Sequence, residues 1–225
     1  MDLTRIEATF KAPSDEMVSI VGCGAIGSQV AIQLAKLGMS RFTLYDHDVV
    51  EAHNFVNQAF NIDHIAMHKT QALAALIRSI NPEAEITTYE EELLKEEEQL
   101  EGFVFLATDN PSSRRHCLEK NMTNRAVLGW FDCRTELWAV QVFSRAHTSE
   151  GVKSLLDTLD FTDEEAEKNL PRAASGCHAK QASGITSAIG AATMAKLFVD
   201  FVKDKTIRTF TRVDLGNFDL ESYKA

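Results

Sequence analysis

The fold is decided by the stretch VSIVGCGAIG, residues 18–27. Its first half is apolar and rich in β-branched residues, as in a buried strand, and residues 28–37 continue with helical spacing of apolar positions. Between the two, Gly22, Gly24 and Gly27 form the pattern Gly-x-Gly-x-x-Gly. Such glycines permit a tight turn, a phosphate against main-chain N–H groups, and close packing of helix on strand. The stretch predicts a strand, a phosphate-binding turn and a helix, although the glycines alone also fit an ordinary strand-to-helix turn.

Two charged residues downstream favour a nucleotide over an ordinary turn. Residues 41–45 predict a second strand that ends at Asp46, 24 positions after Gly22, near the spacing at which an acidic side chain binds a ribose. Residues 66–80 predict a helix with Lys69 in its first turn, where a cation opposes the helix dipole. Phosphate binding would explain a lysine at that position.

A third charged residue, Asp109, follows a continuous apolar run. Residues 103–107 have the composition of a strand that is buried on both faces of a parallel sheet. Asp109 fits two roles: the N-cap of a helix predicted over residues 112–121, or a member of a site shared with Asp46. The second role follows because α/β sheets bind ligands at the carboxyl ends of their strands.

The remaining strands complete an α/β pattern. They are predicted over residues 84–89, 126–129, 139–143 and 207–215, with residues 132–134 as the connection between the second and third of these. The pattern predicts a Rossmann-like, doubly wound, mainly parallel sheet with helices on both faces and an antiparallel extension.

The chain is predicted to be a single domain over residues 1–225, with 1–16 as an N-terminal arm. Residues 147–175 are polar and irregular, and we expect a mobile loop there with a short helix around 154–159. A long helix over 185–201 contains many small residues, which predicts close packing in the core or against a second subunit. The segment after residue 215 is predicted to be a polar tail.

Composition excludes several classes of function. The formal net charge of -10 disfavours general binding to a nucleic-acid backbone. We find neither a signal-like start nor an uncharged apolar run long enough to cross a membrane, so we expect a cytoplasmic protein without a membrane partner. The four cysteines are scattered and form no C-x-x-C pair, so we expect neither disulfides nor structural zinc.

With these residues in place, the chain resembles the ThiF/MoeB/HesA family of adenylating enzymes, whose fold ubiquitin-activating enzymes share. The motifs that carry the resemblance are Gly22-x-Gly24-x-x-Gly27, Asp46-His47-Asp48, Asn54 to Gln58, Lys69, and Thr108-Asp109-Asn110 followed by Arg114. The resemblance implies that ATP activates a carboxylate, commonly the C-terminus of a ubiquitin-like protein or a peptide, and that pyrophosphate is released.

The resemblance also implies roles for single residues. It implies that Asp46 holds the ribose, that Asn54 and Lys69 hold the phosphates, and that Asp109 is catalytic and binds Mg²⁺. The other residues that it places at the nucleotide are Asp48, Asn57, Gln58 and Arg114.

Two further residues take their roles from the same resemblance. Arg5 would be donated across a homodimer to the partner's catalytic site. Cys177 precedes the predicted long helix, where some relatives carry a cysteine that accepts an acyl group. A helix start favours the thiolate form of such a residue, and a simple free thiol is the alternative.

The chain departs from the family pattern at Asn57, where the family usually has an arginine that binds phosphate. The N-terminal arm is also short. Both departures favour an alternative, a catalytically impaired nucleotide-binding or scaffold partner subunit. A tRNA-modifying cyclase of the same fold is a second alternative, which the net charge weakens. An NAD-linked oxidoreductase fits the glycines and Asp46 but explains neither Lys69 nor Asp109.

Overall fold

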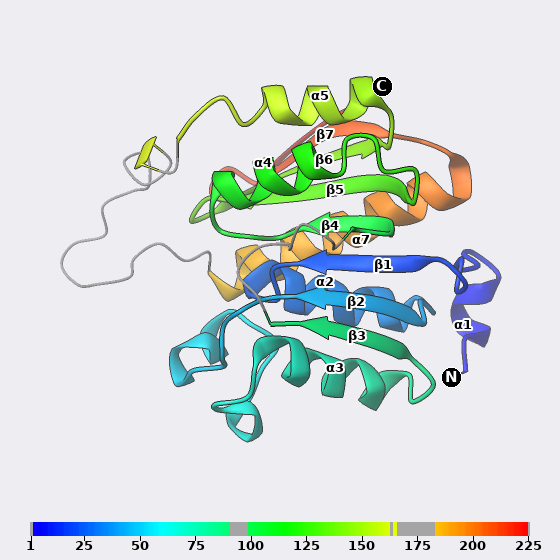
Figure 1. Cartoon of the computed structure of the whole chain (residues 1–225), viewed down its shortest axis with the longest axis vertical. Helices are drawn as coiled ribbons and strands as arrows, with labels where there is room; N and C mark the ends of the chain where they lie inside the picture. Colours follow the sequence, from blue (N-terminus) through cyan, green and yellow to red (C-terminus); the bar gives the residue numbers. More distant parts are fainter. Residues whose placement is uncertain (1, 91–98, 163, 166–182, 225) are drawn as a thin grey trace.

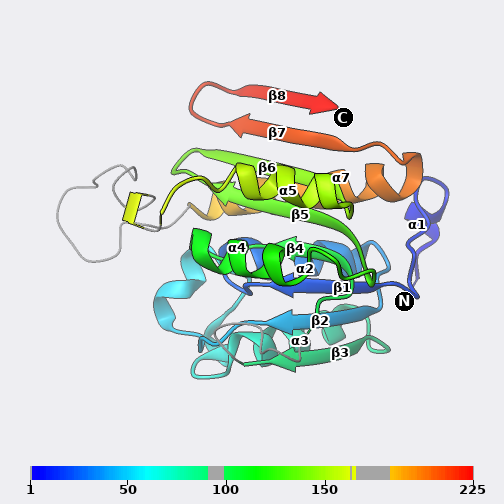
Figure 2. The same ribbon diagram turned by 45° about the horizontal axis from the view of Figure 1, so that its top comes forward.

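A single eight-stranded sheet organises the chain. The computed structural model describes residues 2–90, 99–162, 164–165 and 183–224. The strand order is β3-β2-β1-β4-β5-β6-β7-β8 (Figures 1 and 2). The strands are β1 Met17–Val21, β2 Arg41–Tyr45, β3 Glu85–Tyr89, β4 Gly102–Leu106, β5 Val127–Thr135, β6 Ala139–Ala146, β7 Arg208–Asp214 and β8 Asp219–Lys224. The first five strands of this order, from β3 through β2, β1 and β4 to β5, pair in parallel, and β5, β6, β7 and β8 pair antiparallel. This confirms the predicted Rossmann-like sheet with its antiparallel extension.

Helices cover both faces of the sheet, as predicted. The helices are α1 Thr4–Glu7, α2 Ala25–Lys36, α3 Lys69–Ile80, α4 Pro111–Lys120, α5 Ser149–Asp157 and α7 Gly184–Asp204, with short 3-10 helices η1 Ala52–Val56 and η2 Ile62–His64. One core cluster joins α2, α3 and α7 to the sheet, and the other joins α4 and α5 to the opposite face. Figure 2 shows α4 and α5 lying side by side on that face.

Strand β4 shows why the central strands are apolar throughout. Phe103 and Phe105 pack in the cluster under α7, whereas Val104 and Leu106 pack in the cluster under α4 and α5. Since both faces of the strand are buried, alternation with polar residues is lost. The continuous apolar run therefore identified this strand correctly.

The structure corrects the predicted connection at residues 132–134. Strand β5 continues through these positions to Thr135, and Asp132 pairs in register with Leu106 of β4 and Phe143 of β6. The prediction was wrong because charged residues inside a central strand suggest a loop. Here Arg114 and Arg134 pair with the buried carboxylate and compensate its charge.

Two other elements differ from prediction. The expected polar tail is β8, which forms an antiparallel hairpin with β7. It has no apolar alternation because it is an edge strand whose residues are nearly all exposed. Helix α5 begins at Ser149, where the Thr148 side chain caps it, five residues before the predicted helix start; part of the expected loop is thus helical.

Helix α7 is confirmed as a core helix, and Gly190 permits its close approach to α2. A Cβ at Gly190 would lie 2.8 Å from the Ile26 side chain and 3.1 Å from Cys133 Sγ. By length and mean hydropathy alone, α7 is the one helix in the described ranges that would qualify to span a membrane. Its contacts with α2, β5 and β6 account for that apolar composition.

A substitution at Gly27 tests how closely α2 packs on the turn after β1. A Cβ at Gly27 would lie 1.7 Å from the carbonyl oxygen of Gly22. Backbone cannot move aside as a flexible side chain can, so we expect Gly27→Ala to lower the unfolding free energy by about 3 kcal/mol, the upper range for overpacking. Urea denaturation measures this change.

Gly24→Ala is the matched control, because no atom of the described residues lies within 4 Å of a Cβ at that position. It should lose at most about 1 kcal/mol, the usual cost of alanine at a helix N-cap. Equal losses in the two variants would contradict the packing argument.

Candidate functional site

The turn after β1 leaves an open N-terminus on helix α2. Gly22 has φ of 91°, and a Cβ there would lie 2.8 Å from the backbone of Ala107, so the turn packs directly against the end of β4. Gly24 is the N-cap of α2; no side chain caps this helix, and open space surrounds the position of its missing Cβ. Main-chain N–H groups at a helix start with room beside them form an anion-binding site.

Asp46 ties the end of β2 to this turn. Its carboxylate accepts a hydrogen bond from Cys23 N at 2.6 Å and another from Asp48 N at 2.9 Å. Burial raises the pKa of Asp46, while the charge of Lys69 and these two hydrogen bonds partly offset the effect. A carboxylate has about four lone-pair positions, so Asp46 can still accept hydrogen bonds from a ligand.

Lys69 has a partner that the sequence did not reveal. Its Nζ lies 2.6 Å from Asp48 Oδ2, and its backbone N donates to the Asp48 carbonyl at 2.9 Å. Burial raises the pKa of Asp48, but the hydrogen bond and charge of Lys69 outweigh burial, so this pKa lies below its usual value. The ion pair offsets the unfavourable position of the lysine at the start of α3. A structural role therefore explains Lys69 as well as phosphate binding does.

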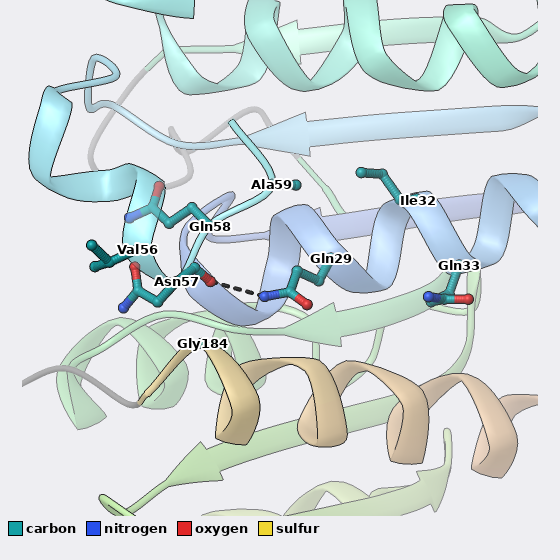
Figure 3. Close-up of a pocket in the computed structure, with 8 residues that line it drawn as sticks. All are labelled: Gln29, Ile32, Gln33, Val56, Asn57, Gln58, Ala59 and Gly184. Carbon is teal, nitrogen blue, oxygen red and sulfur yellow. Dashed lines mark hydrogen bonds between the residues drawn. The ribbon is translucent and has the colours of Figure 1, made fainter. Parts of the chain in front are cut away.

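The segment 54–58 is held by local backbone contacts. Asn54 is buried and its side-chain oxygen accepts a hydrogen bond from Glu51 N at 2.8 Å, closing η1. The carbonyl of Asn57, itself only 4% exposed, accepts a hydrogen bond from Gln29 Nε2 at 2.8 Å (Figure 3). Asn57 and Gln58 line a cavity of about 320 Å³ between α2 and the start of α7.

Asp109 lies exposed at the carboxyl end of β4. The N-cap of α4 is Asn110, whose side-chain oxygen accepts a hydrogen bond from Ser113 N at 2.7 Å. Asp109 is therefore not the N-cap of α4. Of its two predicted roles, membership of a site shared with Asp46 stays a prediction. The Asn110 amide donates to Asp109 Oδ1 at 3.2 Å, which leaves the carboxylate accessible to a cation.

Arg114, in contrast, is only 6% exposed and faces the interior. It forms an ion pair with Asp132 and donates hydrogen bonds to the carbonyls of Thr108 and Cys133. Burial is the main cause that lowers the pKa of Arg114 to about 10, which keeps it protonated at neutral pH. Arg114 thus holds the loop that carries Asp109.

Asp132 and Arg134 were not predicted as site residues, because their charges suggested a connection between strands. The signal available was a pair of opposite charges, two residues apart, between apolar segments. In a strand such residues lie on the same face.

A second candidate cation site lies after β2. Ligand atoms of Asp46, His47 and Asp48 lie within 4.8 Å of one another. Two main-chain N–H groups already donate to Asp46, and Lys69 already pairs with Asp48, so both carboxylates are partly satisfied. Asp109 is therefore the better placed carboxylate for Mg²⁺ in the described ranges.

The two remaining predicted residues are not part of this cluster. Arg5 lies on α1 and lines a shallow hollow with Lys36, the last residue of α2. Because α2 has 12 residues, it separates Arg5 from the glycine turn by about 18 Å. Arg5 therefore does not reach the site of its own chain. Cys177 lies outside the described residues.

Known proteins resemble this chain in sequence and in fold. A family model described as the ThiF family matches residues 7–225. "Ubiquitin-like modifier-activating enzyme 5" of Oryza sativa subsp. japonica is 37% identical over 75 residues, covering 33% of this chain and 18% of that protein. The protein of the same name from Drosophila simulans is 39% identical over 75 residues, with coverages of 33% and 19%. The match thus spans about a fifth of these relatives' length.

Two solved structures share the fold over most of the chain. The structure of PaaA has a TM-score of 0.71 at 16% identity and covers 94% of this chain and 64% of its own. Escherichia coli MccB with ATP has a TM-score of 0.65 at 14% identity, with coverages of 94% and 64%. At this identity the likeness is one of fold.

Thiol labelling tests which cysteines are reactive. Cys23, Cys117 and Cys133 are buried, and burial raises the pKa of Cys117 and Cys133 to about 12 and that of Cys23 well above its usual value. We expect none of the three to react with iodoacetamide in the native protein at pH 8, because thiolate is the reactive form.

Any rapid labelling of the native protein would then report on Cys177, and Cys177→Ser should abolish it. Mass spectrometry locates the modified residue. Rapid modification of Cys117 or Cys133 under native conditions would show that our account of their burial is wrong.

Proposed function

Because the chain belongs to the ThiF family, we propose that it activates a carboxylate by ATP-dependent adenylation. The observation that carries the proposal is the gathering of four features at the carboxyl ends of adjacent strands. These are the open start of α2, Asp46 after β2, Lys69 at the start of α3, and Asp109 after β4. A nucleoside triphosphate is well matched by a site that combines an acidic group, a cation and helix N–H groups.

The residues would divide the work as follows. Asp46 accepts hydrogen bonds from the ribose hydroxyls, and the N–H groups after Gly24 receive the phosphates. The Lys69 ammonium group leaves its ion pair with Asp48 and binds a phosphate oxygen instead. Asp109 would hold Mg²⁺, and the charge of this ion would offset negative charge on the phosphates. The substrate carboxylate attacks the α-phosphorus, the bond from that phosphorus to the bridging oxygen breaks, and pyrophosphate leaves.

The substrate we propose is the C-terminus of a ubiquitin-like protein or a peptide. This choice is motivated by relatives named for activating a ubiquitin-like modifier and by a structural neighbour, MccB, that was solved with MccA.

We further propose a homodimer in which a second chain supplies Arg5, since the arginine lies far from the site of its own chain. Cys177 would accept the activated acyl group if the reaction continues to a thioester.

A second candidate function follows from Asn57. The position where the family usually has arginine carries a buried amide, which supplies no cation to the phosphates. The chain would then bind nucleotide as a partner subunit without turnover. ATP binding without exchange, restored by a second protein, would favour this candidate over adenylation.

Pyrophosphate exchange into ATP tests the main proposal. With a set of peptides and ubiquitin-like proteins that end in a free carboxylate, wild type should exchange pyrophosphate with at least one. Lys69→Met and Asp109→Asn should each reduce exchange by about a hundredfold or more, the usual cost of removing one charge-stabilising group.

Lys36→Met is the control, because Lys36 is exposed at the opposite end of α2. It should exchange at the wild-type rate. If no carboxylate supports exchange, or if Asp109→Asn exchanges as wild type does, adenylation at this site is wrong.

A further inference from the structure

Asp132 is a fully buried carboxylate that connects two arginines. One of its oxygens pairs with Arg114, and the other, Oδ2, accepts hydrogen bonds from Arg134 Nε at 3.0 Å and Nη2 at 2.7 Å. The carboxylate lies in β5, beside the end of β4. The two charged hydrogen bonds from Arg134 are directional and orient its guanidinium group, whereas Arg114 is held at Asp132 by the ion pair and by its hydrogen bonds to the Thr108 and Cys133 carbonyls.

Each arginine also holds a loop. Arg114 donates to the carbonyl of Thr108, the residue immediately before Asp109. On the other side, Arg134 donates to the carbonyl of Thr158 at 2.8 Å and to its hydroxyl at 2.7 Å, at the C-terminal end of α5. Its guanidinium lies 4.4 Å from the centre of the Phe143 ring. The network therefore joins the Asp109 loop to the end of α5.

Stability alone gives a weak reason for such a network. Well-packed apolar residues often replace a buried ion pair without loss, because desolvation of the charges offsets their attraction. Loss of one partner is a different matter, because it leaves an uncompensated charge. A role in orienting the loop that carries Asp109 therefore explains these three charged side chains better than a gain in stability does.

We propose that Asp132 and Arg134 are positioning residues for Asp109: they hold Arg114 on the Thr108 carbonyl and away from the Asp109 carboxylate. Without Asp132, Arg114 would lose its carboxylate partner and would pair with Asp109, which lies five residues before it, and this pairing would compete with a cation. The proposal rests on the proposed function, in which Asp109 binds Mg²⁺.

The test measures ATP affinity by calorimetry across a range of Mg²⁺ concentrations, using the full chain without a carboxylate substrate. In wild type, Mg²⁺ should tighten ATP binding, and Asp109→Asn should abolish this effect. Asp132→Asn should raise the Mg²⁺ concentration needed by about tenfold to a hundredfold, the usual effect of removing a partner behind a metal ligand. ATP affinity without Mg²⁺ should change less than twofold.

Asp214→Asn is the matched control. Asp214 is also buried, and it accepts hydrogen bonds from Arg212 at 2.8 Å and from the backbone of the β7–β8 turn, far from β4 in the sheet. It should lower the melting temperature without moving the Mg²⁺ dependence. An equal shift in this variant would mean that Asp132→Asn acts through general destabilisation, and would overturn the proposal.

Arg134→Gln provides a milder variant should Asp132→Asn fail to fold, because the Arg134 side chain is 17% exposed. It removes one of the two arginines from Asp132 and should shift the Mg²⁺ dependence in the same direction, by about threefold to tenfold if part of the support is lost. An unchanged Mg²⁺ dependence in a folded Arg134→Gln or Asp132→Asn, with the effect of Asp109→Asn intact, overturns the positioning role. If Mg²⁺ does not change the ATP affinity of wild type, the proposed function is wrong.

Discussion

At position 27 any side chain would place its Cβ 1.7 Å from the carbonyl oxygen of Gly22, so the start of α2 lies directly on the turn after β1. The rest of the site depends on this close approach. It brings the first N–H groups of α2 close to the end of β1, while Gly22 in the same turn lies against the backbone of Ala107 at the end of β4. Asp46 and Asp109 reach the same edge because β2 and β4 flank β1 in parallel.

Around this turn, charged side chains are held by partners of opposite charge. Lys69 pairs with Asp48, and Asp132 pairs with both Arg114 and Arg134. Asp109 is the exception among these groups, because in the described ranges its carboxylate accepts a hydrogen bond from the neutral amide of Asn110 and has no cationic side chain paired with it. An exposed carboxylate beside neutralised charges is suited to receive a cation. The arrangement thus separates groups that support the site from groups that face the ligand.

Much of the fold was predictable because its signals are local. The glycine pattern located the turn, and the run at residues 103–107 identified β4, since a strand buried on both faces has only apolar residues. Prediction failed where a residue's partner is distant in sequence. Asp132 suggested a loop because one of its two compensating arginines lies on α4, and the ion pair that buries Arg114 could not be expected from its position in the sequence. Strand β8 lacks alternation because both its faces are exposed.

By itself, the sequence determined the α/β order, the glycine turn and the residue types that collect at one edge of the sheet, because glycine geometry and apolar periodicity act over a few residues. Only the tertiary structure decided which charges are free. It paired Lys69 with Asp48, replaced Asp109 by Asn110 as the cap of α4, and placed Arg5 at the far end of α2. The physical reason is that burial and ion pairing depend on distances between strands and helices, which spacing along the chain does not specify.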